Sequence, residues 1–121
     1  MKKDNIVVEK TYAFAIRIVK CYQYLATEQR EFVLSKQMLR SGTSIGANVE
    51  EAVGGQSEKD FYSKLNISYK EARETHYWLR LLRDTEFLDK KISESLLTDN
   101  EEILKLIGSI IKTMKSKIPN S

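Results

Sequence analysis

Apolar residues recur at intervals of three and four positions along nearly the whole chain, which is the spacing of one face of an α-helix. The pattern predicts helices over four ranges: about 5–26, 35–53, 57–82, and from 89 or 93 to about 117. No stretch alternates apolar and polar residues as a half-buried strand does. Four long amphipathic helices with short connections favour an all-α fold, an antiparallel up-down-up-down four-helix bundle, as one domain over residues 1–121.

Each predicted helix has a row of apolar or small residues that we assign to the core. In chain order these rows are Val7, Phe14, Ile18, Cys21 and Leu25; Met38, Ile45, Val49 and Ala52; Phe61, Leu65, Ser68, Ala72, Thr75, Leu79 and Leu82; and Ile92, Leu96, Ile103, Ile107, Ile110 and Met114. The third row follows a heptad spacing with small residues in its middle, which suits close helix packing.

Two helices have more apolar surface than one core contact needs. The first has a second row beside its core row: Val8, Tyr12, Ala15, Val19, Tyr22 and Ala26. The third has Ile67, Trp78 and Leu81 on one flank. Two interpretations stay open, a broad intramolecular core and an interface between copies of the chain, because apolar surface left over after packing is commonly an interface.

The helix ends have recognisable signals. The Ser35 hydroxyl is placed to cap the first turn of the second helix. Ser57 and Asp60 resemble a capping box for the third helix, with Asp in place of Glu or Gln. The Gly54-Gly55 pair is expected to end the second helix, because glycine adopts a left-handed conformation at low cost.

The second helix contains a thin polar stretch from Arg40 to Ala52. Gly42 and Gly46 would let a neighbouring helix approach closely, and counting back from the turn near residue 55 places Arg40 level with Glu71. We therefore predict an interior ion pair from Arg40 to Glu71 or Glu74, beside the seam that these small residues are expected to form between the second and third helices. The predicted polar seam comprises Arg40, Ser41, Ser44, Asn48, Glu51, Glu71 and Glu74. It is either a satisfied hydrogen-bond network or a polar pocket.

Composition narrows the function classes. The 121 residues are 41% hydrophobic and 31% charged, which excludes disorder, and no apolar run reaches the ~20 residues of a membrane span. Cys21 is the only cysteine, so no intramolecular disulfide is possible and a cytoplasmic location is expected.

The net charge of +3 is mild, but basic residues gather on the outward faces of three helices. Such faces, with a tyrosine among them, can contact phosphates and stack on bases of RNA or DNA. The candidate nucleic-acid-binding residues are Lys10, Arg17, Lys20, Lys70, Arg73, Tyr77, Arg80, Lys105, Lys112 and Lys115. The alternative is a solvated face with no ligand.

Catalytic arrangements are not supported. His76 is the only histidine and shares no sequence context with Cys21. Di-metal bundles need Glu-x-x-His pairs, but the residue three positions after Glu71 is Glu74. Arg73 lies only three positions before His76, closer than in the Arg-x(4–6)-His motif of helical RNases. We therefore expect a non-enzymatic protein without cofactor, metal or small-molecule substrate.

Two segments together resemble a known family. One reads Gln37-Met-Leu-Arg-Ser-Gly-Thr-Ser-Ile-Gly-Ala-Asn48, followed by Glu51-Ala52. The other contains Ser57-x-x-Asp60-Phe61, Lys64-Leu65 and Lys70-Glu71-Ala72-x-Glu74-Thr75-x-Tyr77-Trp78-Leu79. They are similar to the second and third helices of the four helix bundle proteins associated with intervening sequences of bacterial 23S rRNA genes, and the resemblance covers nearly the whole chain.

The resemblance implies a small helical bundle that assembles as a homo-oligomer, since some family members are pentamers. It is also similar to the accessory proteins of the reverse transcriptases in diversity-generating retroelements, where a basic pentameric barrel binds nucleic acid. No general catalytic activity belongs to the family. Two functions stay open: a nucleic-acid-binding oligomer, and a structural or protein-interaction module tied to a reverse transcriptase or a toxin-like partner.

Overall fold

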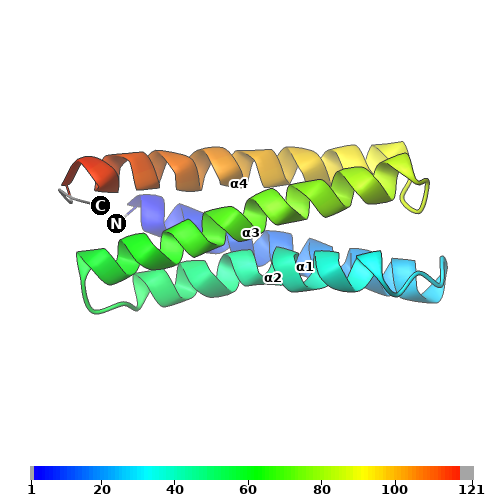
Figure 1. The fold of residues 1–121 in the computed structure, drawn as a ribbon, viewed down its shortest axis with the longest axis horizontal. Helices are drawn as coiled ribbons and strands as arrows, with labels where there is room; N and C mark the ends of the chain where they lie inside the picture. The colour runs from blue at the N-terminus through cyan, green and yellow to red at the C-terminus, as the bar shows by residue number, and fades with distance from the viewer. Residues whose placement is uncertain (1, 118–121) are drawn as a thin grey trace.

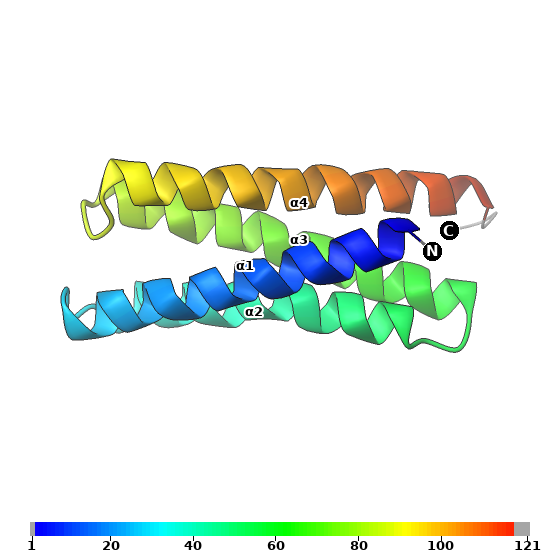
Figure 2. The same ribbon diagram turned by 180° about the vertical axis from the view of Figure 1, so that it is seen from behind.

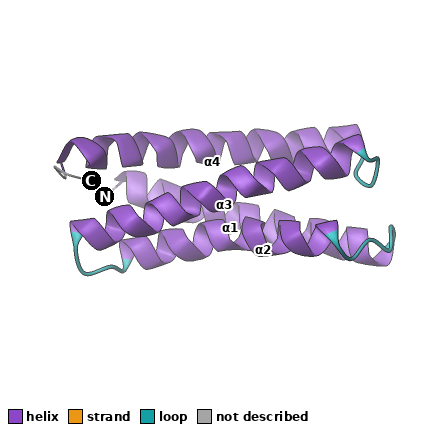
Figure 3. Ribbon diagram, viewed as in Figure 1, coloured by secondary structure: helices purple, strands orange, loops and turns teal. Residues whose placement is uncertain are grey.

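The computed structural model describes residues 2–117, and all regular structure within them is helical. The four helices are α1 (Lys2–Thr27), α2 (Leu34–Val53), α3 (Glu58–Asp84) and α4 (Lys90–Lys117). The predicted all-helical class with four helices is confirmed, with most boundaries within a few residues of the predicted ones. Figure 3 shows how short the connections between the helices are.

The four helices lie along one long axis (Figures 1 and 2). The α1–α2 and α3–α4 loops are at one end, and the α2–α3 turn lies at the other end with the chain termini (Figure 1). Helix α2 makes its most extensive contact with α3, whereas α1 and α4 share the smallest of the helix–helix contacts.

The core contains nearly all of the predicted rows. Every predicted core residue of α1 and α2 is buried, as are the predicted core residues of α3 from Leu65 to Leu82. Phe61 and Met114 are half-buried and pack against the core. The prediction that Ile92 belongs to the core is wrong, because its side chain is 44% exposed. Leu88 from the preceding loop and Ser93 take the buried positions at that end of the bundle.

The two glycines inside α2 face α1. A Cβ atom on Gly42 would lie 2.8 Å from Cγ2 of Ile18, and one on Gly46 would lie 3.2 Å from the backbone oxygen of Thr11. Their small size therefore permits the close approach of α1 and α2. The sequence interpretation that assigned them to a seam with the third helix is wrong, since periodicity does not say which neighbour a face meets.

Two helix ends are stabilised differently from prediction. Ser35 lies inside α2, and its hydroxyl donates to the backbone oxygen of Glu31 at 2.6 Å. The Glu31 carboxylate instead accepts the amides of Val33, Leu34 and Ser35, at 3.1, 3.0 and 2.7 Å. The Glu31 side chain therefore caps the start of α2, the role that the sequence predicted for the Ser35 hydroxyl.

At the other end of α2, Gly54 has a φ of −82°, so no left-handed residue ends the helix. The amides of Gly54 and Gly55 bond to the backbone oxygens of Glu50 and Ala52, which tightens the last turn without such a residue. The predicted Ser57 cap at the start of α3 is confirmed. The Ser57 hydroxyl accepts a hydrogen bond from the backbone amide of Asp60 at 3.0 Å.

Candidate interaction surfaces

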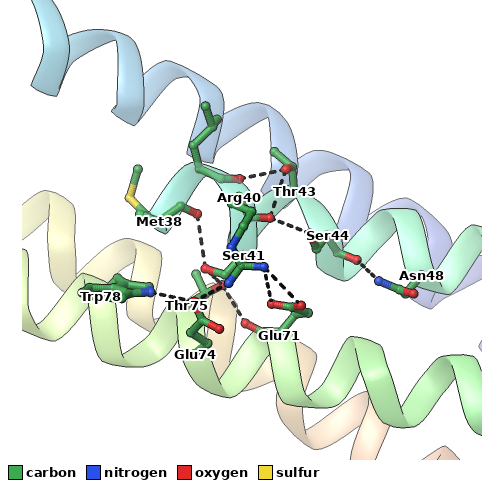
Figure 4. A network of polar contacts seen from close by, with 11 residues as sticks. Met38, Arg40, Ser41, Thr43, Ser44, Asn48, Glu71, Glu74, Thr75 and Trp78 are labelled. Atoms are coloured by element: carbon green, nitrogen blue, oxygen red, sulfur yellow. Dashed lines mark hydrogen bonds and ion pairs between the residues drawn. The ribbon is translucent and has the colours of Figure 1, made fainter. Parts of the chain in front are cut away.

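The predicted Arg40 ion pair is confirmed and involves both carboxylates (Figure 4). Nη1 of Arg40 lies 3.2 Å from Oε1 of Glu71, and Nη2 bonds to Glu74. Trp78 donates its indole N–H to Glu74 at 2.9 Å. The Arg40 side chain is 50% exposed, so the pair lies at the surface of the α2–α3 contact. Its predicted interior position is wrong, because Arg40 lies on the rim of the face that α2 turns toward α3.

This arrangement shifts the pKa values of both Glu74 and Arg40. The hydrogen bond from Trp78, followed by the bond and charge of Arg40, holds the pKa of Glu74 below its ordinary value, against the opposing effect of burial. The Glu74 hydrogen bond likewise raises the pKa of the Arg40 guanidinium. The ion pair is therefore fully charged at neutral pH.

The buried part of the α2–α3 contact is made by small hydroxyl residues. Thr75 donates to the Ser41 hydroxyl at 2.8 Å, and Ser68 donates to the backbone oxygen of Ile45 at 2.8 Å. Both pairs are buried, where an unmade hydrogen bond is costly. They hold α2 and α3 in one register.

The other seam residues are also satisfied within the fold. The Ser44 hydroxyl donates to the backbone oxygen of Arg40 at 2.6 Å. The side-chain amide of Asn48 donates to the backbone oxygen of Ser44 at 2.9 Å (Figure 4). Glu51 pairs with Lys64 at 3.3 Å. Of the two interpretations of the seam, these contacts favour the hydrogen-bond network over the polar pocket.

His76 and Cys21 do not meet. Nε2 of His76 lies 2.9 Å from Glu101 in α4, whereas Cys21 is buried in the core row of α1. Burial raises the pKa of the Cys21 thiol to about 11, so the thiol is protonated and unreactive near neutral pH. Within the described part of the chain, no three His, Cys, Asp or Glu side chains are grouped as a metal site requires. None of the helices in residues 2–117 is long and apolar enough to cross a membrane.

Two of the predicted nucleic-acid residues form bridges between α1 and α4. Nζ of Lys10 lies 3.3 Å from Oε2 of Glu102. Nη1 of Arg17 lies 2.5 Å from Asp99, and its Nη2 donates to Ser95 at 3.0 Å. Their charges are thus balanced by acids of the neighbouring helix. Lys20 is exposed on the same helix.

The remaining candidates lie on the outward sides of α3 and α4, and we call them the α3–α4 basic face: Lys70, Arg73, Tyr77, Arg80, Lys105, Lys112 and Lys115. The His76–Glu101 contact sets the register of the two helices and places Arg73 level with residue 104, next to Lys105. Among residues 5–117, whose side chains are described, none of these lysines and arginines makes an ion pair.

An aromatic side chain is held within this basic face. Tyr77 is half exposed, and its ring packs edge-on against Trp78 with 5.0 Å between the ring centroids. The Arg80 guanidinium lies 5.9 Å from the centre of the Tyr77 ring, and its Nε donates to the backbone oxygen of His76. The charge of Arg80 also acts on Asp84, and that of Lys70 acts on Glu74. A supported aromatic ring beside basic side chains has the features of a base-stacking platform.

The second apolar row of the first helix is divided between inside and outside. Val8 and Tyr22 pack partly against the core. Tyr12 is 61% exposed, and Ile16 and Val19 are exposed beside it. Together with Ala15 they form what we call the α1 stripe, which borders a shallow hollow of about 410 Å³. The apolar excess predicted for this helix is therefore partly surface.

The predicted third-helix flank is less uniform. Ile67 is 40% exposed, whereas Trp78 and Leu81 are half-buried. Trp78 also packs against the core and bonds to Glu74, so its role inside the fold is established by contacts. Ile67 is the member of this flank that offers free apolar surface.

Sequence reasoning missed one surface, the loop before α2. Phe32 and Val33 are both exposed there, although they are apolar and adjacent. The available signal was that these two residues precede the start of the helical pattern and belong to no core row.

Comparisons with known proteins agree with this architecture. A family model described as 23S rRNA-intervening sequence protein matches residues 3–109. The crystal structure of a protein of unknown function from the S23 ribosomal protein family of Bacteroides thetaiotaomicron is 57% identical to this chain. The similarity covers 91% of this chain and 98% of the other, with a TM-score of 0.89. No curated protein matches.

Proposed function

Because the chain belongs to the 23S rRNA-intervening sequence protein family, we propose that it is a non-enzymatic subunit of a homo-oligomer. The observation that carries the proposal is the exposed α1 stripe. The subunit is an antiparallel up-down-up-down bundle in this proposal, which the alternating positions of the loops support (Figure 1). Its setting is the cytoplasm, where an unpaired cysteine such as Cys21 is ordinary.

The α1 stripe is a patch of large apolar side chains on one helix. Tyr12, Ile16 and Val19 are three or four residues apart, so they lie on one side of α1. Covering such a patch removes apolar surface from water at ~25 cal/mol per Å². A second copy of the chain is the partner that the family resemblance favours.

A ring requires two different faces on each subunit. The α1 stripe supplies one, and the exposed Ile67 on α3 supplies the other, with Trp78 and Leu81 beside it. Contact of the stripe with the Ile67 flank of the next subunit would repeat around a closed ring. We propose a pentamer, the ring that the family resemblance implies.

Sedimentation velocity of the Ile16→Glu variant tests self-association. A carboxylate at the centre of the stripe is expected to raise the dissociation constant at least about tenfold, because it would be buried without a partner. Thr98→Glu, the same added charge on the exposed side of α4, should sediment as the unmodified chain does. A single-chain mass for the unmodified protein at all concentrations would exclude the oligomer.

A second function, RNA or DNA binding, is favoured by the α3–α4 basic face. The register of the His76–Glu101 contact brings Arg73 level with the residue before Lys105, neither of them has an ion pair among the described side chains, and Tyr77 offers a stacking surface between Lys70 and Arg80. Phosphate contacts of this kind give a salt-dependent affinity. The competing alternative is a structural or protein-interaction module, such as a reverse-transcriptase accessory, without direct contact to nucleic acid.

Gel shifts with RNA and DNA across a salt series separate the two alternatives. Arg73→Glu with Lys105→Glu should weaken binding and lower the salt slope by about one for each lost phosphate contact. Lys90→Glu with Lys91→Glu, the same charge change at the end of the bundle, serves as the matched control. If neither RNA nor DNA is shifted at low salt, nucleic-acid binding is excluded and the structural or protein-interaction module is the function.

A further inference from the structure

The two ends of the bundle offer different surfaces. The α1–α2 loop is at one end, and the α2–α3 turn is at the other (Figure 1). In the α1–α2 loop Phe32 is 44% exposed and Val33 is 72% exposed, and we call this pair the apolar tip. Two adjacent exposed apolar side chains at a loop end are a candidate contact surface.

The apolar tip is held in one conformation by its neighbours. The Glu31 carboxylate accepts three successive amides, including that of Val33, which joins the loop firmly to the start of α2. Arg30 has a left-handed backbone with a φ of 52°, and its guanidinium lies 6.0 Å from the centre of the Phe32 ring. A loop ordered in advance loses little conformational entropy on docking.

An apolar groove lies at the opposite end, and we call it the end groove. Its walls include Val53 at the end of α2, Phe61 at the start of α3, and Ile110 and Met114 on α4. Its volume is about 430 Å³, within the range of roughly 300–1,000 Å³ that holds organic ligands, so it has the volume for an aromatic side chain. Glu58 and Lys117 form part of its rim.

Each end has one acidic and one basic side chain near its apolar surface. Arg30 and Glu28 flank the apolar tip, and the end groove has Glu58 and Lys117. With the side chains of residues 5–117, none of these four side chains makes an ion pair. Each sign at one end can therefore meet the opposite sign at the other.

We propose that the apolar tip of one copy inserts into the end groove of the next, with Arg30 facing Glu58. Two different surfaces at opposite ends of a long axis meet in this contact, so it repeats without closing and forms rows of bundles. The contact is separate from the α1 stripe. Lateral rings would stack through it, and single bundles would join end to end.

A capping experiment tests this contact in the Ile16→Glu background, where lateral association is disabled. The tip variant is Phe32→Ser with Val33→Ser, and the groove variant is Met114→Glu. Sedimentation of the background chain should show species that lengthen as concentration rises. Each variant alone should lose this behaviour, with at least about a tenfold weaker association. An equimolar mixture should give a two-chain species and nothing longer, because each chain retains one working end.

Charge reversal gives a second test that leaves the apolar groove intact. Arg30→Glu and Glu58→Arg should each weaken end-to-end association, and both changes in one chain should restore it. Thr98→Glu, which adds a charge on the exposed side of α4 outside the tip, the groove and the α1 stripe, should have no effect in this background. Circular dichroism should show unchanged helix content in every variant.

Three outcomes would overturn the proposal. The first is a single-bundle species for the background chain at every concentration. The second is association that the tip, groove and charge variants leave unchanged. The third is association that begins only when residues 118–121 are deleted, because the end groove would then belong to the chain's own C-terminal segment.

Discussion

Gly42 has no room for an added methyl group where α2 meets α1. Its Cβ would lie 2.8 Å from Cγ2 and 2.9 Å from Cγ1 of Ile18, a branched side chain that is completely buried. Overpacking of this kind costs about 1–3 kcal/mol, which exceeds the gain of ~1 kcal/mol from replacing glycine in a helix. We expect Gly42→Ala to lower the free energy of unfolding by up to about 2 kcal/mol, measured by urea denaturation.

Gly54 provides the matched control for this substitution. Its Cβ would have no neighbour closer than 3.5 Å, and its φ of −82° is open to alanine. Gly54→Ala should therefore leave the protein equally stable, or more stable by about 0.4–1 kcal/mol. If the Gly42 variant were as stable as the Gly54 variant, the close approach of α1 and α2 would be wrong.

At the scale of the helices, the contact of α2 with α3 has a built-in optical reporter. Trp78 is the only tryptophan, and its indole donates to Glu74, which also pairs with Arg40 of α2. Because the pKa of Glu74 is lowered in the folded protein, the carboxylate contributes stability above its ordinary pKa of 4.5. That contribution is lost as the pH falls through the lowered value.

Trp78 fluorescence is thus expected to change with a midpoint below pH 4.5 in the folded protein. Arg40→Gln should move this midpoint upward, since the Arg40 hydrogen bond and charge favour the ionised carboxylate. Arg83→Gln, which removes a pair with Asp84 far along α3, should leave it unchanged. Glu74→Gln should abolish the transition, and its persistence there would assign the signal to another group.

The Arg40 pair itself should add little to stability. Its guanidinium is half exposed, and exposed ion pairs contribute about 0–1 kcal/mol. The register of α2 and α3 depends more on the buried Thr75–Ser41 and Ser68–Ile45 bonds, which have no access to water.

Across the whole molecule, the helices do not hold one another equally. The contact of α2 with α3 is the most extensive, and that of α1 with α4 is the smallest. We expect amides of α2 and α3 to exchange most slowly in native-state hydrogen exchange, because opening them requires breaking the largest contact. Amides of α1 and α4 should exchange sooner. Equal protection of all four helices would show that the bundle opens only as one unit.

The sequence predicted residues well where the determining interactions are local. Phe14, Ile45 and Leu65 are buried as their helical spacing required, since a periodicity of 3.6 residues needs no knowledge of neighbouring helices. Arg40 was paired correctly because its partners lie across a short turn, and counting from that turn sets the register. The core prediction for Ile92 was wrong because a loop residue, Leu88, closes the core at that end.

The candidate surfaces could be predicted only in part. The excess of apolar residues on the first helix was visible in its second row, but which members stay exposed depends on how α2 covers them. Lys10 and Arg17 resembled the other basic candidates until the register of α1 against α4 brought Glu102 and Asp99 to them. That register depends on three intervening connections, which no local pattern encodes.

The amino-acid sequence by itself determined the four helices, nearly all of their core residues, the Arg40 partners and the family, because each depends on local spacing or on short separations along the chain. Only the tertiary structure decided which faces of those helices remain free. It directed Gly42 and Gly46 toward α1, exposed Ile16 and Ile67, and placed Phe32 and the end groove at opposite ends. Exposure is a property of all the helices packed together, so it follows from distances between segments far apart in the chain.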